Sequence, residues 1–268
     1  MPWFGFIALS LLLIFFASAP FIVSPPRNVQ APVLTILRME NGEFFAKENL
    51  KNGPILYGWL HAIPGGIWSA LMPFQHVKSL RRKYPVLHRW SGRIIIALSL
   101  TLAISSMTFG PNNLIFSAST TYIHKMKVGV DRPITVLAWP SFRMLVWFLS
   151  PTLMISALQT IRTARAKQFD RHQYWASVLT AVGYSIPMQR VMMIILSIIA
   201  AHLQYLSPEQ RAFFHIPNDN APIIEKSQVE RAAFSATAWA SVVVMTIWSV
   251  TQSYCRNVEL EKVKKAKA

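Results

Sequence analysis

The chain alternates long apolar segments with short polar ones, and each apolar segment has about the length of a membrane-spanning helix. About 20 predominantly apolar residues in a helix cross the ~30 Å hydrocarbon core of a bilayer. From Pro54 onward, for example, 22 consecutive residues include no Asp, Glu, Lys or Arg. The sequence therefore predicts an all-α, polytopic transmembrane helix bundle. Its expected spans, about six, are residues 3–23, 54–75, 93–109, 134–160, 174–201 and 233–254.

The composition agrees with a single integral membrane domain over residues 1–268. Hydrophobic residues make up 53% of the chain and charged residues only 14%, whereas soluble domains carry about 25% charged residues. Cys255 is the single cysteine, so an intrachain disulfide and a multi-cysteine metal site are excluded. The sequence has no Gly-rich phosphate loop, nucleophile elbow or HExxH zinc motif. No catalytic residue is assigned, and whether the protein is an enzyme stays open.

The first apolar segment has two interpretations, a retained span or a cleaved signal peptide. Small residues at Ala17-Ser18-Ala19 are typical of a cleavage site. However, no Lys or Arg precedes the segment, its apolar stretch is long for a signal peptide, and Pro20 follows the candidate site. We expect the segment to be retained. Residues 24–52 are polar with mixed charge, and part of them is expected to form an interfacial helix.

The uneven distribution of Lys and Arg between the connections predicts the orientation. The 76–93 turn, the 161–172 turn and the C-terminal tail hold 15 basic residues against three acidic ones. The other three connections hold ten against eight. Because cytoplasmic loops carry the excess of Lys and Arg, we predict that both termini and these two turns are cytoplasmic. The net charge of +16 is interrupted by apolar spans, so the expected partner is the lipid bilayer and not nucleic acid.

Three ionisable side chains fall inside the predicted spans: His61, Arg143 and Arg190. Such groups cost ~3 kcal/mol each to insert and are functional candidates by default. At ~1.5 Å per residue, all three are expected roughly 10–17 Å below the outer boundary. The predicted spans contain no Asp or Glu, so a bound acidic ligand is a candidate partner for the arginines. Together with Gln75, these residues are the candidates for a ligand pocket.

Less specific roles are open for the same residues. Arg143 would reach the interface with its long side chain, which is the role we favour for it. Arg190 would bond backbone carbonyls that Pro187 leaves exposed. His61 would be a packed histidine bonded to a carbonyl. The neighbouring Gly65-Gly66 pair is expected to let another backbone approach closely.

A second polar group gathers where the predicted cytoplasmic turns enter the spans. His88 and His172 stand at such entrances and are expected to face each other across the bundle. Asp170 is the one acid in the two turns, so we predict that it pairs with Arg89 or Arg93. The alternative is a solvated basic rim that binds anionic lipid head groups. The candidates of this rim are His88, Arg89, Gly92, Arg93, Asp170 and His172.

The order of these motifs resembles an uncharacterised family of multi-pass membrane proteins, domain of unknown function 2306. Its members show a histidine in a span that ends near Gly-Pro-Phe-Gln, and then His-Arg-x-x-Gly-Arg. The corresponding residues here are His61 and Pro73-Phe74-Gln75, then His88, Arg89, Gly92 and Arg93, followed by a stretch from His172 to Arg190. The similar core covers residues 54–201, with Met72 in place of the family glycine, and with Gln173, Ala176 and Val178 as departures in the second stretch. The resemblance implies a membrane fold and no assigned reaction.

Two functions from different classes follow. The first is a protein that binds or transforms a small apolar acidic ligand in a pocket lined by histidine and arginine. The alternative is a b-type haem electron-transfer protein. His61 and His76 lie ~22 Å apart along one span, which resembles the spacing of two haems in transmembrane cytochromes. Haem b is thus a candidate cofactor, with His61, His76, His88 and His172 as candidate ligands and no metal ion assigned.

Overall fold

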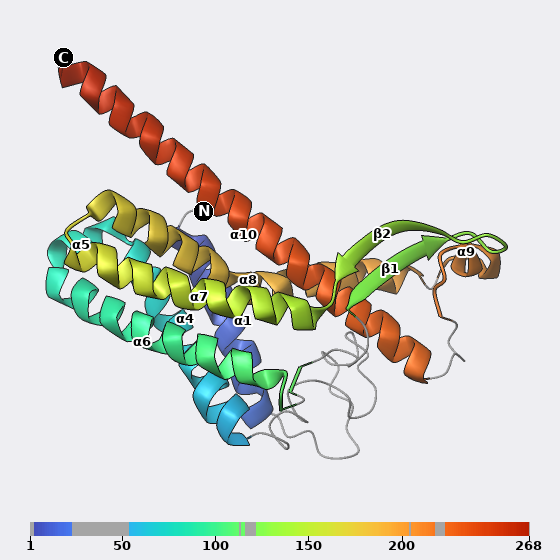
Figure 1. The fold of residues 1–268 in the computed structure, drawn as a ribbon. Coiled ribbons are helices and arrows are strands. Elements are labelled where there is room, and N and C mark those ends of the chain that lie inside the picture. The colour runs from blue at the N-terminus through green and yellow to red at the C-terminus, as the bar shows by residue number, and fades with distance from the viewer. Residues whose placement is uncertain are drawn as a thin grey trace.

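A computed structural model describes residues 3–22, 54–112, 114–115, 122–203, 205–217 and 223–267, and most of these residues are helical (Figure 1). The helices are α1 (Trp3–Ile22), the π-helix η1 (Pro54–Ala62), α4 (Ile63–His76), α5 (Lys78–Lys83), α6 (Pro85–Phe109), α7 (Phe142–Arg165), α8 (Phe169–Leu203), α9 (Pro208–Phe213) and α10 (Ile223–Lys267). The strands β1 (Ile123–Val128) and β2 (Ile134–Pro140) pair in an antiparallel hairpin. The expected interfacial helix within 24–52 lies outside the described residues.

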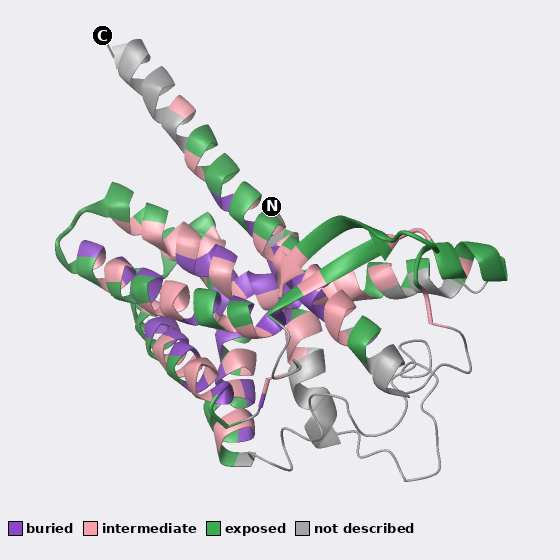
Figure 2. Ribbon diagram, turned by 45° about the vertical axis from the view of Figure 1, so that its right-hand side comes forward, coloured by how far each residue is buried: buried purple, intermediate pink, exposed green. Residues whose placement is uncertain are grey.

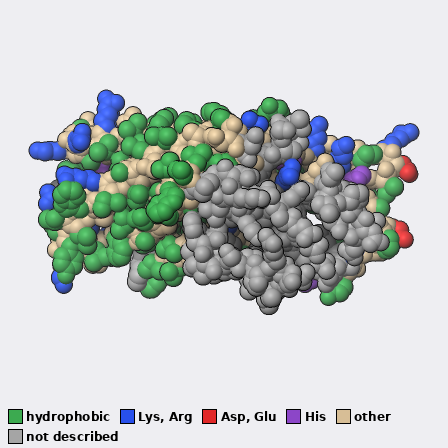
Figure 3. Space-filling model, turned by 90° about the horizontal axis from the view of Figure 1, so that it is seen from below, with side chains coloured by type: hydrophobic (Ala, Val, Ile, Leu, Met, Phe, Trp, Pro, Cys, Tyr) green, Lys and Arg blue, Asp and Glu red, His purple; other side chains and the backbone are tan. Residues whose placement is uncertain are grey.

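The long helices form a closed arrangement with one helix added outside it. Each helix packs against the next around a ring: α1 against α4, α4 against α6, α6 against α7, α7 against α8, and α8 against α1. Helix α10 packs along α8 and α7. In Figure 1, α5 lies at one end of this bundle, whereas the hairpin and α9 lie at the opposite end. Lys and Arg side chains gather at the α5 end in Figure 3, while the acidic side chains seen in this view lie at the other end. We refer to them as the basic end and the hairpin end.

Four helical segments in the described part of the chain are long and apolar enough to cross a membrane. They are Pro85–Phe109, Phe142–Arg165, Phe169–Leu196 and Arg231–Cys255. The prediction of a helical membrane protein is therefore confirmed, but six spans are not. Within α1, whose 20 residues run from Trp3 to Ile22, the apolar segment found among the described side chains is Phe4–Ile14. The predicted 54–75 span is divided between η1 and α4.

The predicted 134–160 span is wrong at its beginning. Residues Ile134–Pro140 form strand β2, which also makes the strictly all-α prediction wrong. Ser141 has an extended backbone (φ −67°, ψ 161°), so α7 begins only at Phe142. The apolar residues of β2 mimic a helical span in composition, but much of the strand is exposed at the hairpin end.

The other boundaries differ in the opposite direction, because the helices extend beyond the apolar segments. The third helix begins at Pro85, whose fixed φ suits the first turn of a helix, and not at the predicted residue 93. The basic residues His88, Arg89 and Arg93 consequently lie on α6 itself. Both α8 and α10 also continue past their predicted ends at 201 and 254.

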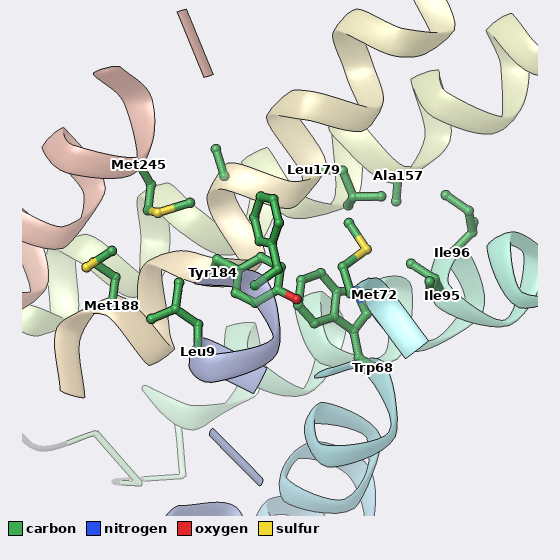
Figure 4. Packing of buried hydrophobic residues seen from close by; sticks show 12 residues of the cluster. Leu9, Trp68, Met72, Ile95, Ile96, Ala157, Leu179, Tyr184, Met188 and Met245 are labelled. Atoms are coloured by element: carbon green, nitrogen blue, oxygen red, sulfur yellow. The ribbon is translucent and has the colours of Figure 1, made fainter. Parts of the chain in front are cut away.

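The core of the bundle lies where α1, α4, α6 and α8 meet (Figure 2). Trp68 and Tyr184 are at most 2% exposed, and their ring centroids lie 5.3 Å apart (Figure 4). The polar atoms of both rings are satisfied: Trp68 Nε1 donates to Ser99 Oγ (2.9 Å), and Tyr184 Oη lies 2.8 Å from Ser10 Oγ. The apolar rings therefore fill the core without leaving a buried donor unpaired.

The Trp68 side chain of α4 reaches α8 at Gly183. A Cβ atom at this position would overlap the ring of Trp68. By contrast, a Cβ at Gly66 would meet no described atom within 4 Å, and one at Gly65 would make only an ordinary contact with Leu102. The predicted close approach at Gly65-Gly66 is therefore wrong, and glycine is needed on the partner helix instead.

Candidate functional site

His61 lies on η1 against the last turns of α6, in the hairpin half of the bundle. Its Nδ1 atom is 3.1 Å from Ser105 Oγ and 3.4 Å from Ser106 Oγ. The imidazole stands edge-on to Phe109, with 4.7 Å between ring centroids, and stacks at 6.2 Å on Tyr57. The histidine is thus bonded to two serine hydroxyls and not to a backbone carbonyl, the alternative that the sequence left open.

The π-helix that carries His61 has a physical cause in the sequence. Pro64 has no N–H, and its ring clashes with the carbonyl of the residue four positions earlier, Leu60. The preceding segment opens into wider turns with i→i+5 bonds, a rare conformation that occurs frequently at functional sites. Because such a turn holds more than four residues, Tyr57 and His61 lie almost above one another and their rings stack.

Tyr57 connects His61 to Arg190 and was missed in the sequence analysis. The phenol ring stacks on His61, and the charge of Arg190 acts on the phenol over a longer range. Two candidates that are far apart in the sequence thus belong to one cluster, which we name the outer cluster: Tyr57, His61, Ser105, Ser106, Phe109 and Arg190. A signal was present in the sequence, since Tyr57 stands four residues before His61 in an uncharged run.

Arg190 is held by α8 at its contact with α10. Its guanidinium carbon lies 5.7 Å from the centroid of Phe234, and Nη1 donates to Met193 Sδ at 3.6 Å. The adjacent Gln189 is fully buried and donates from Nε2 to the Phe234 carbonyl (3.1 Å). The guanidinium group therefore lies against an aromatic ring and a thioether.

Arg143 does not lie deep in a span as predicted. It is the second residue of α7, because the preceding segment is a strand. Its Nε atom lies 4.0 Å from the place that a Cβ on Gly110 would occupy, directly after the end of α6. A cation is stabilised near the C-terminus of a helix, where the backbone carbonyls point outward. Arg143 therefore borders the hairpin end, in line with the interfacial role that we favoured for it.

Gln75 also does not join the outer cluster. It lies ~21 Å along the helix from His61 and donates from Nε2 to Ser91 Oγ at 2.6 Å. A Cβ on Gly92 would stand 3.5 Å from Gln75 Oε1, which is an ordinary contact. The pair connects α4 to α6 at the basic end, and the assignment of Gln75 to the pocket is wrong.

The two rim histidines come near one another at the basic end. His88 and His172 interact electrostatically. His172 Nδ1 lies 3.0 Å from the carbonyl oxygen of Thr160, to which it donates, and His88 Nδ1 is buried without a hydrogen bond in the described part of the chain. The rim therefore has a histidine pair, but it lies at the other end of the bundle from His61.

The predicted pairing of Asp170 with Arg89 or Arg93 is wrong. All three side chains are exposed, and the described residues include no ion pair within 4.0 Å between them. Arg93 instead lies over the ring of Trp90, 4.9 Å from its centroid. Exposed rim charges gain little from pairing because water screens them.

The candidate haem ligands on the second span have no histidine opposite them in the described residues. His61 faces serines and aromatic rings, as described above. His76 stacks on Phe6 at 4.5 Å, and its Nε2 lies 3.2 Å from Thr180 Oγ1. No group of three or more His, Cys, Asp or Glu that would suit a metal ion occurs among the described residues. His88 and His172 are the one candidate pair for bis-histidine ligation that the described structure brings together.

Comparisons with known proteins find no matching family model, no matching curated protein and no matching solved structure. The resemblance to the family of domain of unknown function 2306 therefore stays a prediction. What the fold defines is a helical membrane protein, and its most distinctive polar feature is the outer cluster of histidine, tyrosine, serine and arginine.

Proposed function

We propose that this chain is a multi-pass membrane protein that binds a small apolar acid at the outer cluster. Both termini and the basic end face the cytoplasm, and α1 with the η1–α4 pair supplies the two further spans. The carboxylate of the ligand lies near Arg190, and its apolar chain lies among the helices. His61 provides a second polar contact.

The observation that carries this proposal is the position of Tyr57. It stacks on His61, and the charge of Arg190 acts on its phenol over a longer range, so we infer that a ligand here would lie between His61 and Arg190. A positive charge in apolar surroundings is stabilised by an anion, and the apolar segments contain no Asp or Glu. The π-helix adds support, because π-helical turns occur frequently at functional sites.

Binding of dodecanoate and of dodecanol to the purified protein in nanodiscs tests the proposal. The two probes have the same chain and differ in charge, so the acid should bind more tightly. Arg190→Leu should weaken the binding of dodecanoate by about 10- to 100-fold, which corresponds to the loss of one charge-assisted hydrogen bond. The same substitution should leave the binding of dodecanol unchanged. The variant should stay folded, because the substitution also removes the cost of burying a charge.

Arg93→Leu is the matched control, since Arg93 also lies over an aromatic ring but at the basic end. Equal binding of the acid and the alcohol by the unmodified protein would overturn the proposal. A visible absorption spectrum of the same sample tests the haem alternative: a Soret band that disappears in His88→Ala and His172→Ala would favour the electron carrier.

Cysteine labelling tests the proposed orientation. In a Cys255→Ser background, Ser79→Cys and Gln168→Cys place thiols at the basic end, and Val130→Cys places one on the exposed hairpin. In sealed cells, an impermeant reagent should label position 130 and not positions 79 and 168, because the basic loops stay inside. The reverse pattern would show that the orientation is inverted.

A further inference from the structure

The hydrogen bonds of Ser105 and Ser106 indicate the direction of their hydroxyl hydrogens. Ser106 Oγ donates to the carbonyl of Leu102 at 2.6 Å, and Ser105 Oγ donates to the same carbonyl at 3.1 Å. A serine hydroxyl has one hydrogen and can accept through its lone pairs. When both hydrogens point to their own helix, both oxygens face His61 as acceptors.

We infer that the two serines hold neutral His61 with its proton on Nδ1, so that Nε2 faces the site as a hydrogen-bond acceptor. The inference rests on the proposed function for the ligand and names its class more closely. The ligand carries a hydrogen-bond donor for His61 as well as an anion for Arg190. An apolar hydroxy acid has both groups.

The remaining ring nitrogen supports this assignment. A neutral imidazole has one donor and one acceptor nitrogen, and the bond made by one nitrogen sets the state of the other. Both described hydrogen bonds of His61 are made by Nδ1, and no described residue forms a hydrogen bond with Nε2. An acceptor in apolar surroundings loses free energy unless a donor reaches it, so a ligand hydroxyl is favoured over a bare hydrocarbon at this position.

The tautomer is measured directly by ¹⁵N NMR of histidine-labelled protein without ligand, and the His61 signals are assigned by their loss in His61→Gln. We expect the shift of a protonated nitrogen at Nδ1 and of an unprotonated nitrogen at Nε2. Ser105→Ala with Ser106→Ala should move the population toward the opposite tautomer. Thr101→Ala is the control, because Thr101 lies on the same helix and donates to its own helix at Ala97; it should leave the His61 signals unchanged.

The ligand class is tested with 3-hydroxydodecanoate and dodecanoate. The hydroxy acid should bind about 2- to 10-fold more tightly, the gain from one additional hydrogen bond. This preference should disappear in the double serine variant, so the ratio of the two affinities, and not the affinity for dodecanoate alone, reports on the tautomer of His61. If the serines had a purely structural role, the double variant would bind both acids more weakly by the same factor.

The outcomes separate this inference from the proposed function. An Nε2–H tautomer in the unmodified protein, or a double variant with an unchanged spectrum, overturns the role of the serines even if both acids bind. Equal affinity for the two acids overturns the hydroxy-acid class. Failure of both acids to bind overturns the proposed function and the ligand class with it, while the measured tautomer still decides the role of the serines.

Discussion

The outer cluster and the rim at the basic end contain the same residue types, histidine and arginine, in different surroundings. In the outer cluster, Arg190 lies against a phenylalanine ring and a thioether, and His61 is bonded to two serines. At the basic end, Arg89 and Arg93 are exposed, and no described ion pair joins them to Asp170. Water screens exposed charges, so their individual contacts contribute little. Residues in apolar surroundings are sensitive to each contact they make, and they carry the proposed site.

The largest expected effect comes from breaking the contact between α4 and α8 that lies between the two regions. Gly183→Ala places a methyl group where the Trp68 ring lies, and overpacking of a core typically costs about 1–3 kcal/mol or more. We expect a lower free energy of unfolding, measured by denaturant titration in detergent micelles. Because the overlap is with a buried, rigid ring, the backbone of α8 must move.

Gly66→Ala is the matched control for Gly183→Ala. A Cβ at position 66 meets no described atom within 4 Å, and the residue lies inside α4. Alanine in a helix interior is favoured over glycine by about 0.5–1 kcal/mol, so this variant should unfold no more easily than the unmodified protein. Equal destabilisation by both substitutions would show that the close approach is not at Gly183.

An intermediate effect is expected from removing one histidine in each region. His61→Ala should weaken 3-hydroxydodecanoate binding by about 2- to 10-fold, since the hydrogen bond from the ligand hydroxyl to Nε2, worth ~1 kcal/mol, is lost. His88→Ala at the basic end should leave the binding of this acid unchanged. Isothermal titration of both variants measures the difference. A larger loss in His88→Ala would move the ligand site to the basic end.

The smallest effect is expected from the rim acid. Asp170 lies in the first turn of α8, where a negative charge interacts favourably with the helix dipole by about 0.3–1 kcal/mol. Asp170→Asn should therefore lower the free energy of unfolding by less than ~1 kcal/mol. The loss should become smaller at high salt. A loss of several kcal/mol, independent of salt, would indicate an ion pair at the rim after all.

The sequence predicted the helices better than their ends. Apolar length located the helical segments because a long uncharged run strongly favours a buried or lipid-facing helix. It failed at β2, where a run of apolar residues is mostly exposed on a hairpin, since composition alone does not distinguish such a strand from the start of a span. Because β2 was counted as part of the span, Arg143 was also predicted to lie too deep in the membrane.

The site was predictable only in part. His61 and Arg190 stood out because ionisable residues are rare in apolar segments. The connection between them depends on Tyr57, whose spacing of four residues from His61 was not considered in the sequence analysis. Gln75 was assigned to the wrong region because distance along a helix was not weighed: it bonds Ser91 at the basic end instead.

The π-helix also makes this region unusually sensitive to chain length. An i→i+5 helix accommodates one more residue per hydrogen-bonded turn than an α-helix. Deleting a single residue between Tyr57 and His61 would shorten their spacing from four residues to three, while Pro64 would still disrupt the regular hydrogen bonds of the segment. Tyr57 and the residues before it would turn by about 100° relative to His61, which would move the phenol ring off the imidazole. Insertions and deletions elsewhere in the loops leave such a pairing intact, so in this segment length is constrained as strictly as residue identity.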